Sequence, residues 1–119
     1  GSIGTITTTD NIVYTATYTP TDNVTDTANV ITVTNTGVAD LAGNAGLSTT
    51  DTDSYEVDTV EPTVGISMND TALNVGDTST VTFTFSEEVT GFTSDDVSVE
   101  SGSIGTITTT DNIVYTATY

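Results

Sequence analysis

The eighteen residues GSIGTITTTDNIVYTATY occupy positions 1–18, and the same eighteen residues occur again at positions 102–119. A complete match over this length is far beyond chance, and repetition at a fixed offset is typical of an array of repeated domains. The two occurrences lie 101 positions apart, which corresponds to a β-sandwich domain of about 100 residues. The sequence therefore predicts a tandem array in which each repeat is one domain.

The predicted boundary between two repeats lies near residues 54–62, which read SYEVDTVEP. A short strand-like segment is followed there by acidic residues and by Pro62, and proline is confined to linkers, strand starts and edge strands. We therefore expect residues 1–57 to form the C-terminal part of one repeat and residues 58–119 the N-terminal part of the next. A complete repeat would be residues 58–119 followed by the equivalent of residues 19–57.

Strict alternation of apolar and polar residues predicts the strands. In TVTFTF (80–85), for example, Val81, Phe83 and Phe85 fall on one face and threonines on the other. About seven such segments, with Gly, Asp and Asn between them, predict an all-β fold, an antiparallel Ig-like β-sandwich. No segment predicts a helix, and Asp111-Asn112 predicts a hairpin turn. The expected strands are 63–68, 80–85, 96–100, 104–107, 113–119 (repeated at 12–18), 28–34 and 54–57.

The charge balance excludes several classes of partner. The chain has 17 acidic residues and no Lys, Arg or His, so its formal net charge is −17. No salt bridge between side chains is possible, and clustered carboxylates repel one another unless a cation neutralises them. Nucleic acids and anionic membrane surfaces require Lys and Arg, so neither is an expected partner. Cysteine is absent, which excludes a disulfide framework, and no apolar stretch is long enough to predict a membrane span or a signal peptide.

Four motifs occur in an order that resembles a known family. They are DTVEPTV (58–64), GDTSTVTFTFSEEVTGFTSDDV (76–97), YTATYTPTDN (14–23) and DLAGN (40–44). Together they resemble the bacterial Ig-like repeats of giant RTX-type and Bap-like surface adhesins, among them the extender regions of giant ice-binding adhesins. The resemblance covers the whole chain. It implies a secreted, cell-surface spacer whose repeats stiffen on binding Ca²⁺ and project a distal binding domain from the cell, with neighbouring repeats of the same chain as partners.

Calcium is the expected cofactor because it prefers six to eight oxygen ligands, and the absence of His and Cys disfavours zinc and transition metals. No EF-hand loop is present, so separate loops would have to supply the ligands. One candidate group lies at the junction and in the loops expected to approach it, a second combines two acidic loops at one end of the sheet, and a third lies in TPTDNVTD (19–26) with two further acids. The candidate ligands are Asp40, Asn44, Asp58 and Glu61 for the first group, Glu87, Asp95 and Asp96 for the second, and Asp22, Asp26, Asp70 and Asp77 for the third.

Other interpretations compete with this one. Each acid could be a solvated surface residue, which is the favoured interpretation for Glu88, Glu100 and Asp111. Catalysis is not expected, because a chain without His, Cys, Trp or basic residues offers no nucleophile–base pair and no platform for a sugar, and no small-molecule substrate is predicted. Alternating threonines at 80–84 could order water as an ice-binding face does. Complementary half-domains could also assemble end to end by strand exchange into an extracellular fibre.

Overall fold

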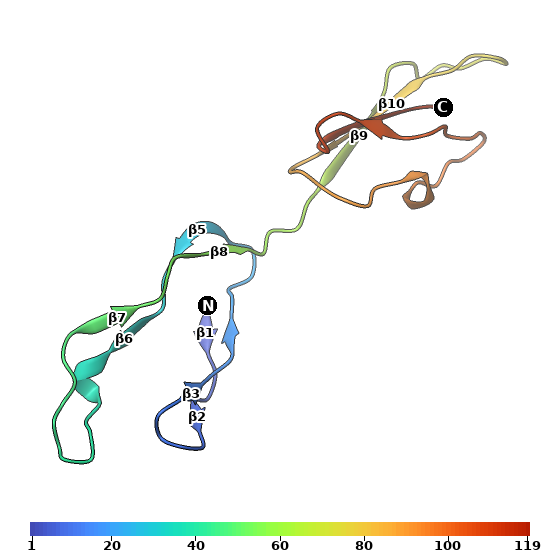
Figure 1. The fold of residues 1–119 in the computed structure, drawn as a ribbon. Helices are drawn as coiled ribbons and strands as arrows, with labels where there is room; N and C mark the ends of the chain where they lie inside the picture. Colours follow the sequence, from blue (N-terminus) through green and yellow to red (C-terminus); the bar gives the residue numbers. More distant parts are fainter. The chain divides into compact units, whose positions relative to one another are not determined.

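The computed structural model describes all residues 1–119, and its chain divides into two compact units, residues 1–61 and residues 62–119 (Figure 1). The fold is all-β, as expected: twelve strands and two single-turn 3₁₀ helices are present, and there is no α-helix. No helix is long and apolar enough to cross a membrane. The antiparallel all-β fold predicted from the alternation pattern is therefore present, and each unit is built from short antiparallel strands.

The second unit contains one four-stranded antiparallel sheet with the strand order β11-β12-β10-β9. The strand that carries Phe83 is central in this sheet, since Phe83 lies opposite Tyr115 on one side and opposite Ile66 on the other. The predictions for 63–68, 80–85 and 113–119 are confirmed to within one residue at each end. The strands are β9 (Val64–Met68), β10 (Thr80–Phe85), β11 (Thr108–Thr109) and β12 (Val114–Thr118).

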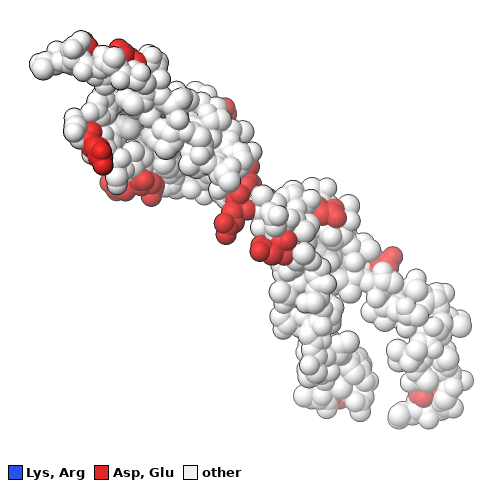
Figure 2. Space-filling model, turned by 180° about the vertical axis from the view of Figure 1, so that it is seen from behind, with Lys and Arg blue, Asp and Glu red and all other residues white.

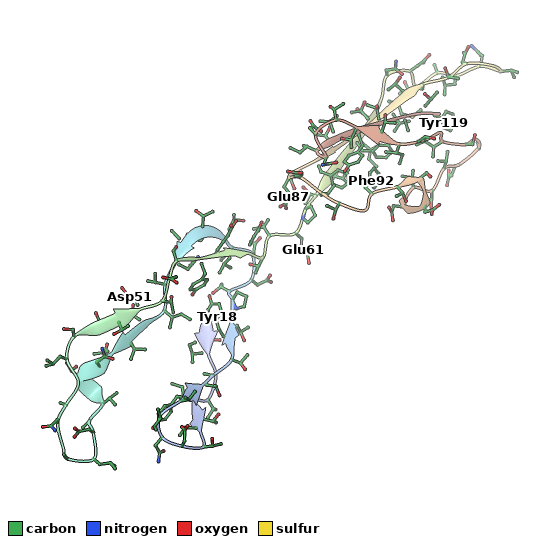
Figure 3. All side chains as sticks on the ribbon, viewed as in Figure 1. Tyr18, Asp51, Glu61, Glu87, Phe92 and Tyr119 are labelled. Carbon is green, nitrogen blue, oxygen red and sulfur yellow. The ribbon has the colours of Figure 1, made fainter.

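The core of this unit lies on one face of the sheet. Val81, Phe83, Tyr115 and Ala117 are buried there, and the alternation along each strand places threonines on the opposite face. Phe92 reaches over from a loop and packs edge-to-face on Phe83, with ring centroids 5.2 Å apart (Figure 3). Such aromatic contacts add to the burial of apolar surface, so a core free of tryptophan is built around one loop phenylalanine.

Two strands that the sequence predicted for this unit are absent. Residues 96–100 form no strand, because a 3₁₀ turn, η2 (Ser94–Asp96), is held by a capping box. Residues 104–107 also lack strand structure: the Gly105 nitrogen donates to the Thr118 carbonyl at 2.8 Å, but regular pairing with β12 begins only at Thr108. The apolar side chains in these segments, Val97 and Ile104 among them, still pack against the core. Alternation thus identified which side chains face inward, but a strand also needs regular backbone hydrogen bonds to a neighbouring strand along its length.

The first unit consists of four two-stranded ribbons. The pairs are β1 with β4, β2 with β3, β5 with β8, and β6 with β7. The strand predicted at 28–34 is divided in two at residues 30–31, between β5 and β6. β5 itself is irregular between Asp26 and Asn29, and the Asn29 amide donates to the carbonyls of Asp26 (3.0 Å) and Tyr55 (3.3 Å). The strand predicted at 12–18 is also divided. The bounds are β1 (Ser2–Ile3), β2 (Thr7–Thr8), β3 (Tyr14–Thr15), β4 (Tyr18–Thr19), β5 (Thr25–Asn29), β6 (Thr32–Thr34), β7 (Thr49–Asp51) and β8 (Tyr55–Asp58), with the 3₁₀ turn η1 (Asn35–Gly37).

The first unit buries little apolar surface. Val57 is its one buried hydrophobic residue, while Leu41 and Leu47 are almost fully exposed. Its main aromatic contact joins Tyr18 and Tyr55, whose rings meet edge-to-face at 5.6 Å. Backbone pairing within ribbons therefore defines this unit, whereas packing on one face of a sheet defines the second.

Candidate functional site

Acidic side chains are the only charged side chains of the molecule. On the face drawn in Figure 2 they lie in separate places, and no Lys or Arg side chain accompanies them. Whether these acids can hold an ion therefore depends on how many carboxylates lie close to one another.

The DLAGN loop holds its acid and amide together. The Asn44 side-chain nitrogen donates to Asp40 Oδ2 at 2.9 Å, and the Asn44 backbone nitrogen donates to Asp40 Oδ1 at 2.8 Å. Ala42 nitrogen donates to the same Oδ1 at 3.0 Å. These hydrogen bonds, that of the Asn44 side chain first, hold the pKa of Asp40 below its ordinary value. The loop thus keeps a charged carboxylate in place at the tip of a ribbon.

The acids of the junction have different surroundings. Asp58 Oδ1 accepts hydrogen bonds from the Thr25 hydroxyl at 3.0 Å and from the Val60 nitrogen at 3.2 Å. The next residue, Thr59, ties this end of β8 to the rest of its unit, since its hydroxyl donates to the Thr21 carbonyl at 2.8 Å. Glu61 is exposed (Figure 3). Asp58 is therefore a fixed oxygen donor, and Glu61 is a solvated one.

The acids of the second group have different local roles. Asp96 Oδ2 accepts from the Thr93 nitrogen at 2.9 Å and forms half of the capping box of η2. Asp95 is exposed, and Glu87 is half-buried. Glu88 accepts from the Asn112 amide at 3.3 Å. Asp96 thus has a structural role of its own, that of ending the loop that carries Phe92.

The third group consists of turn residues, each of which binds a backbone nitrogen in its own loop. This is the ordinary structural role of aspartate in a turn, and it leaves the second carboxylate oxygen of each residue free of that contact. The acceptor–donor pairs are Asp22 with Asn23 (3.0 Å), Asp26 with Ala28 (3.0 Å), Asp70 with Ala72 (3.0 Å) and Asp77 with Asn74 (2.9 Å).

Within either unit, no three acidic side chains lie close enough together to hold a metal ion. Among the candidates, Asp40 and Asn44 are the pair that the structure joins by hydrogen bonds. The donor set fits calcium in its chemistry, because every available group is a carboxylate, amide or carbonyl oxygen. It does not fit in number, so an ion at Asp40 or Asp58 would need further oxygens from carbonyls, water or another repeat.

Two polar features were not predicted from the sequence. The Thr93-to-Asp96 capping box follows the pattern of Ser or Thr followed three residues later by an acid, so the sequence TSDD carried the signal. Ser79 is 2% exposed and lies 2.9 Å from both Asn69 Oδ1 and the Asp70 carbonyl. No sequence signal distinguishes this serine from its neighbours in a run rich in Ser and Thr.

A family model described as a bacterial Ig-like domain matches residues 1–57 and, a second time, residues 58–119. Neither the curated proteins nor the solved structures gave a significant match. The two adjacent matches cover the whole chain.

Proposed function

The chain belongs to the bacterial Ig-like domain family, and from that premise we propose that it is a calcium-stabilised spacer segment of a long bacterial cell-surface adhesin. The family is one of non-catalytic structural domains that are typically extracellular. The proposed task is mechanical: the repeats hold a distal binding domain away from the cell, and their partners are neighbouring repeats and calcium ions.

The observation that carries the proposal is the repetition. Eighteen identical residues recur 101 positions apart, and the family matches twice in succession. A spacer gains length by adding copies of one unit, and identical copies preserve the geometry of each junction. A binding site needs only one copy of its residues, so complete identity over a stretch this long favours a spacer.

The charge supports the role of calcium. A net charge of −17 with no cationic side chain leaves every carboxylate without a protein counter-ion, and self-repulsion of this kind destabilises a compact state. An ion that binds only the folded chain adds about 2.7 kcal/mol to the free energy of unfolding when its concentration is a hundred times its Kd. Extracellular calcium would therefore favour the folded, stiff form over the loose form.

The residues proposed to hold calcium are those with fixed oxygen atoms. Asp40 is held by Asn44, and Asp58 is held by Thr25 and Val60. Each of them keeps a carboxylate oriented before the ion arrives, which lowers the entropic cost of binding. The remaining candidates, Glu61, Glu87, Asp95 and Asp96 among them, would act as additional ligands where a neighbouring repeat approaches.

The test is thermal unfolding of the full chain, which keeps β8 and its pairing with β5 intact, in excess EDTA and in about 10 mM Ca²⁺, which is well above the Kd of roughly 0.1–1 mM typical of extracellular modules. We expect the midpoint to rise by tens of degrees, or folding to require calcium. Magnesium at the same concentration is the control for screening. Asp40→Ala and Asp58→Ala should reduce the rise, and Asp53→Ala should not. An unchanged melt in calcium would overturn the calcium mechanism.

One further observation favours a second candidate function. On the outward face of the sheet, cross-strand pairing aligns hydroxyl side chains in a row of Thr108, Thr116, Thr82 and Ser67, with strands about 4.8 Å apart. A regular hydroxyl row could order water, as an ice-binding face does. Thermal hysteresis in solution that is lost in Thr82→Lys would support this function, and its absence would leave the row as an ordinary solvated sheet face.

A further inference from the structure

The segment that joins β8 to β9 (Figure 1) is bounded at its first end by a hydroxyl side chain that closes a strand pair. Thr59 directly follows β8. Its backbone nitrogen donates to the Val24 carbonyl at 2.9 Å, and the Val24 nitrogen donates to Thr59 Oγ1 at 3.0 Å. These two hydrogen bonds continue the pairing of β5 with β8 by one position beyond Asp58, with the hydroxyl oxygen in the place of a backbone carbonyl.

The same arrangement occurs at the other end of the segment. The Ser86 nitrogen donates to the Thr63 carbonyl at 2.9 Å, and the Thr63 nitrogen donates to Ser86 Oγ at 2.9 Å. Ser86 directly follows β10 and Thr63 directly precedes β9, so these bonds continue the pairing of the two strands by one position. We call the pair of Thr59 with Val24 and the pair of Ser86 with Thr63 the two clasps.

The pattern occurs a third time away from this segment, at the end of the pair formed by β6 and β7. The Thr52 nitrogen donates to the Ile31 carbonyl at 3.0 Å, and the Ile31 nitrogen donates to Thr52 Oγ1 at 3.0 Å. Thr52 directly follows β7, and Ile31 directly precedes β6. A hydroxyl side chain at the residue after a strand is thus a recurring device of this chain, and the two clasps place it on both sides of the boundary between repeats.

The first clasp also holds the loop that leads into β5. Thr59 Oγ1 donates to the Thr21 carbonyl at 2.8 Å, so one hydroxyl binds two backbone groups of this loop. Beside it, the Thr25 hydroxyl donates to Asp58 Oδ1 at 3.0 Å. The end of β8 is therefore attached to the start of β5 by side chains as well as by the strand ladder.

Between the two clasps lie only Val60, Glu61 and Pro62. The Val60 nitrogen is bound to Asp58 Oδ1 at 3.2 Å, and Glu61 is exposed (Figure 3). The ring of Pro62 fixes its own φ, and a residue that precedes proline is restricted to extended conformations. Few backbone dihedrals are therefore left to turn freely between one clasp and the next.

We propose that the two clasps confine the hinge between successive repeats to residues 60–62 and keep the ends of β8 and β9 closed where tension along the chain enters each unit. The proposal rests on the spacer function proposed above, since a spacer has to keep its length. Strand pairs open first at their ends, and residues released there would lengthen the linker and make it more flexible. The clasps consist of hydroxyl and backbone groups only, so they hold without a cation.

The first experiment is ¹⁵N relaxation and amide hydrogen exchange of the full chain in excess EDTA. We expect backbone order parameters close to the value of about 0.85 that is typical of rigid backbone at Thr59 and Thr63, and a clearly lower value at Glu61. Order parameters at Thr59 and Thr63 as low as that of Glu61 would overturn the proposal, because the hinge would then extend into the clasps.

Variants test each clasp by itself. Thr59→Val removes the hydroxyl at nearly constant shape, and the Val24 amide should then exchange at least about fivefold faster, the effect of losing one hydrogen bond. Ser86→Ala should do the same to the Thr63 amide. In both variants the lowered order parameters should spread beyond residues 60–62. Thr52→Val removes the same pattern away from the linker and is the matched control, with the linker unchanged. Unchanged amide shifts of the β10–β12 pair show that each variant is folded.

A distance measurement tests the consequence for the spacer. The chain has no cysteine, so Leu47→Cys and Val75→Cys, at exposed positions of the two units, give two unique sites for spin labels. In EDTA, the distribution of label-to-label distances should be wider when Thr59→Val and Ser86→Ala are combined than in the wild-type background or with Thr52→Val. Equal widths would overturn the proposal. Because calcium is absent throughout, a failure of the clasps is distinguishable from a failure of the calcium mechanism, which the thermal melt decides.

Discussion

Phe92 and Tyr115 meet nearly perpendicularly, with ring centroids 5.2 Å apart and an angle of 87° between the ring planes. Phe92 makes similar edge-to-face contacts with Phe83 and Phe85. One loop side chain thus contacts three aromatic residues of the sheet. Phe92 lies in the loop between β10 and η2, so these contacts attach that loop to the core.

Phe92→Ala should lower the free energy of unfolding of the full chain by about 2–3 kcal/mol, somewhat less than for a fully buried phenylalanine. The physical reason is the loss of aromatic contacts together with a cavity beneath the loop. Chemical denaturation followed by tyrosine fluorescence measures the change. Phe92→Leu keeps most of the apolar volume and is the control, with less than half of the loss. Equal stabilities of the Ala and wild-type chains would show that the loop is not anchored there.

Ser79→Ala should destabilise the second unit by about 1–3 kcal/mol, the cost of leaving buried polar groups without partners. The Ser79 hydroxyl donates to Asn69 Oδ1 and to the Asp70 carbonyl, and it accepts a hydrogen bond from the Asp70 backbone nitrogen at 3.0 Å. Its removal leaves the backbone nitrogen and carbonyl of Asp70 without this partner. Denaturation of the variant, compared with the exposed Ser98→Ala, is the measurement. A loss as small as that of Ser98→Ala would contradict the prediction.

The hairpin acids Asp10 and Asp111 offer a matched pair. Asp111 Oδ1 accepts from the nitrogens of Ile113 and Val114, both at 2.9 Å, and Asp10 Oδ1 accepts equivalently in the first unit. Asp111→Ala should lower the main unfolding midpoint, because its turn leads into the buried strand β12. Asp10→Ala should leave that midpoint unchanged, because its hairpin is exposed. Equal shifts in calorimetry for the two variants would refute this distinction.

The same hydrogen bonds predict a pH dependence. The backbone donors, that of Val114 first for Asp111 and that of Val13 first for Asp10, hold the pKa of each carboxyl below its ordinary value. A lowered folded-state pKa gives stability that is present above the unfolded-state pKa and is lost as pH falls through the folded-state pKa. NMR titration should place both carboxyls below ordinary aspartate and close to each other. A titration of either at or above the ordinary value would contradict the prediction.

The DLAGN loop can be tested apart from calcium. Asn44→Ala removes the main cause of the lowered pKa of Asp40, so in EDTA the Asp40 pKa should move up toward its ordinary value. The stability that the charged Asp40 carboxylate contributes is present above the unfolded-state pKa. In the variant this stability should be lost at a higher pH than in the wild-type chain. Carboxyl NMR titration of both chains is the measurement. Leu41→Ala, at an exposed position in the same loop, is the control and should leave the Asp40 pKa where it was.

The alternation of apolar residues predicted which side chains face the core better than it predicted which segments form strands. Val81 and Phe83 were expected inside and are buried. Val97 lies in the strand predicted at 96–100, and it packs on the core although that segment forms no strand. Alternation reports which side of the backbone is apolar, whereas pairing depends on a neighbour distant in the sequence. The candidate ligands show the same limit, since only Asp40 and Asn44, four residues apart, are joined by a hydrogen bond.

The repeated eighteen residues separate what is local from what is not. In both copies the turn forms alike: Thr8 and Thr109 each donate to a carbonyl five residues on at 2.7 Å, and Asn11 and Asn112 each have a φ of 59°. Burial differs completely, since Tyr14 is 55% exposed and Tyr115 only 6%. The turn is determined by the sequence because its hydrogen bonds join residues within a few positions of one another. The burial of Tyr115 was decided by the tertiary structure, because its partners on β10 and at Phe92 lie far from it in the sequence.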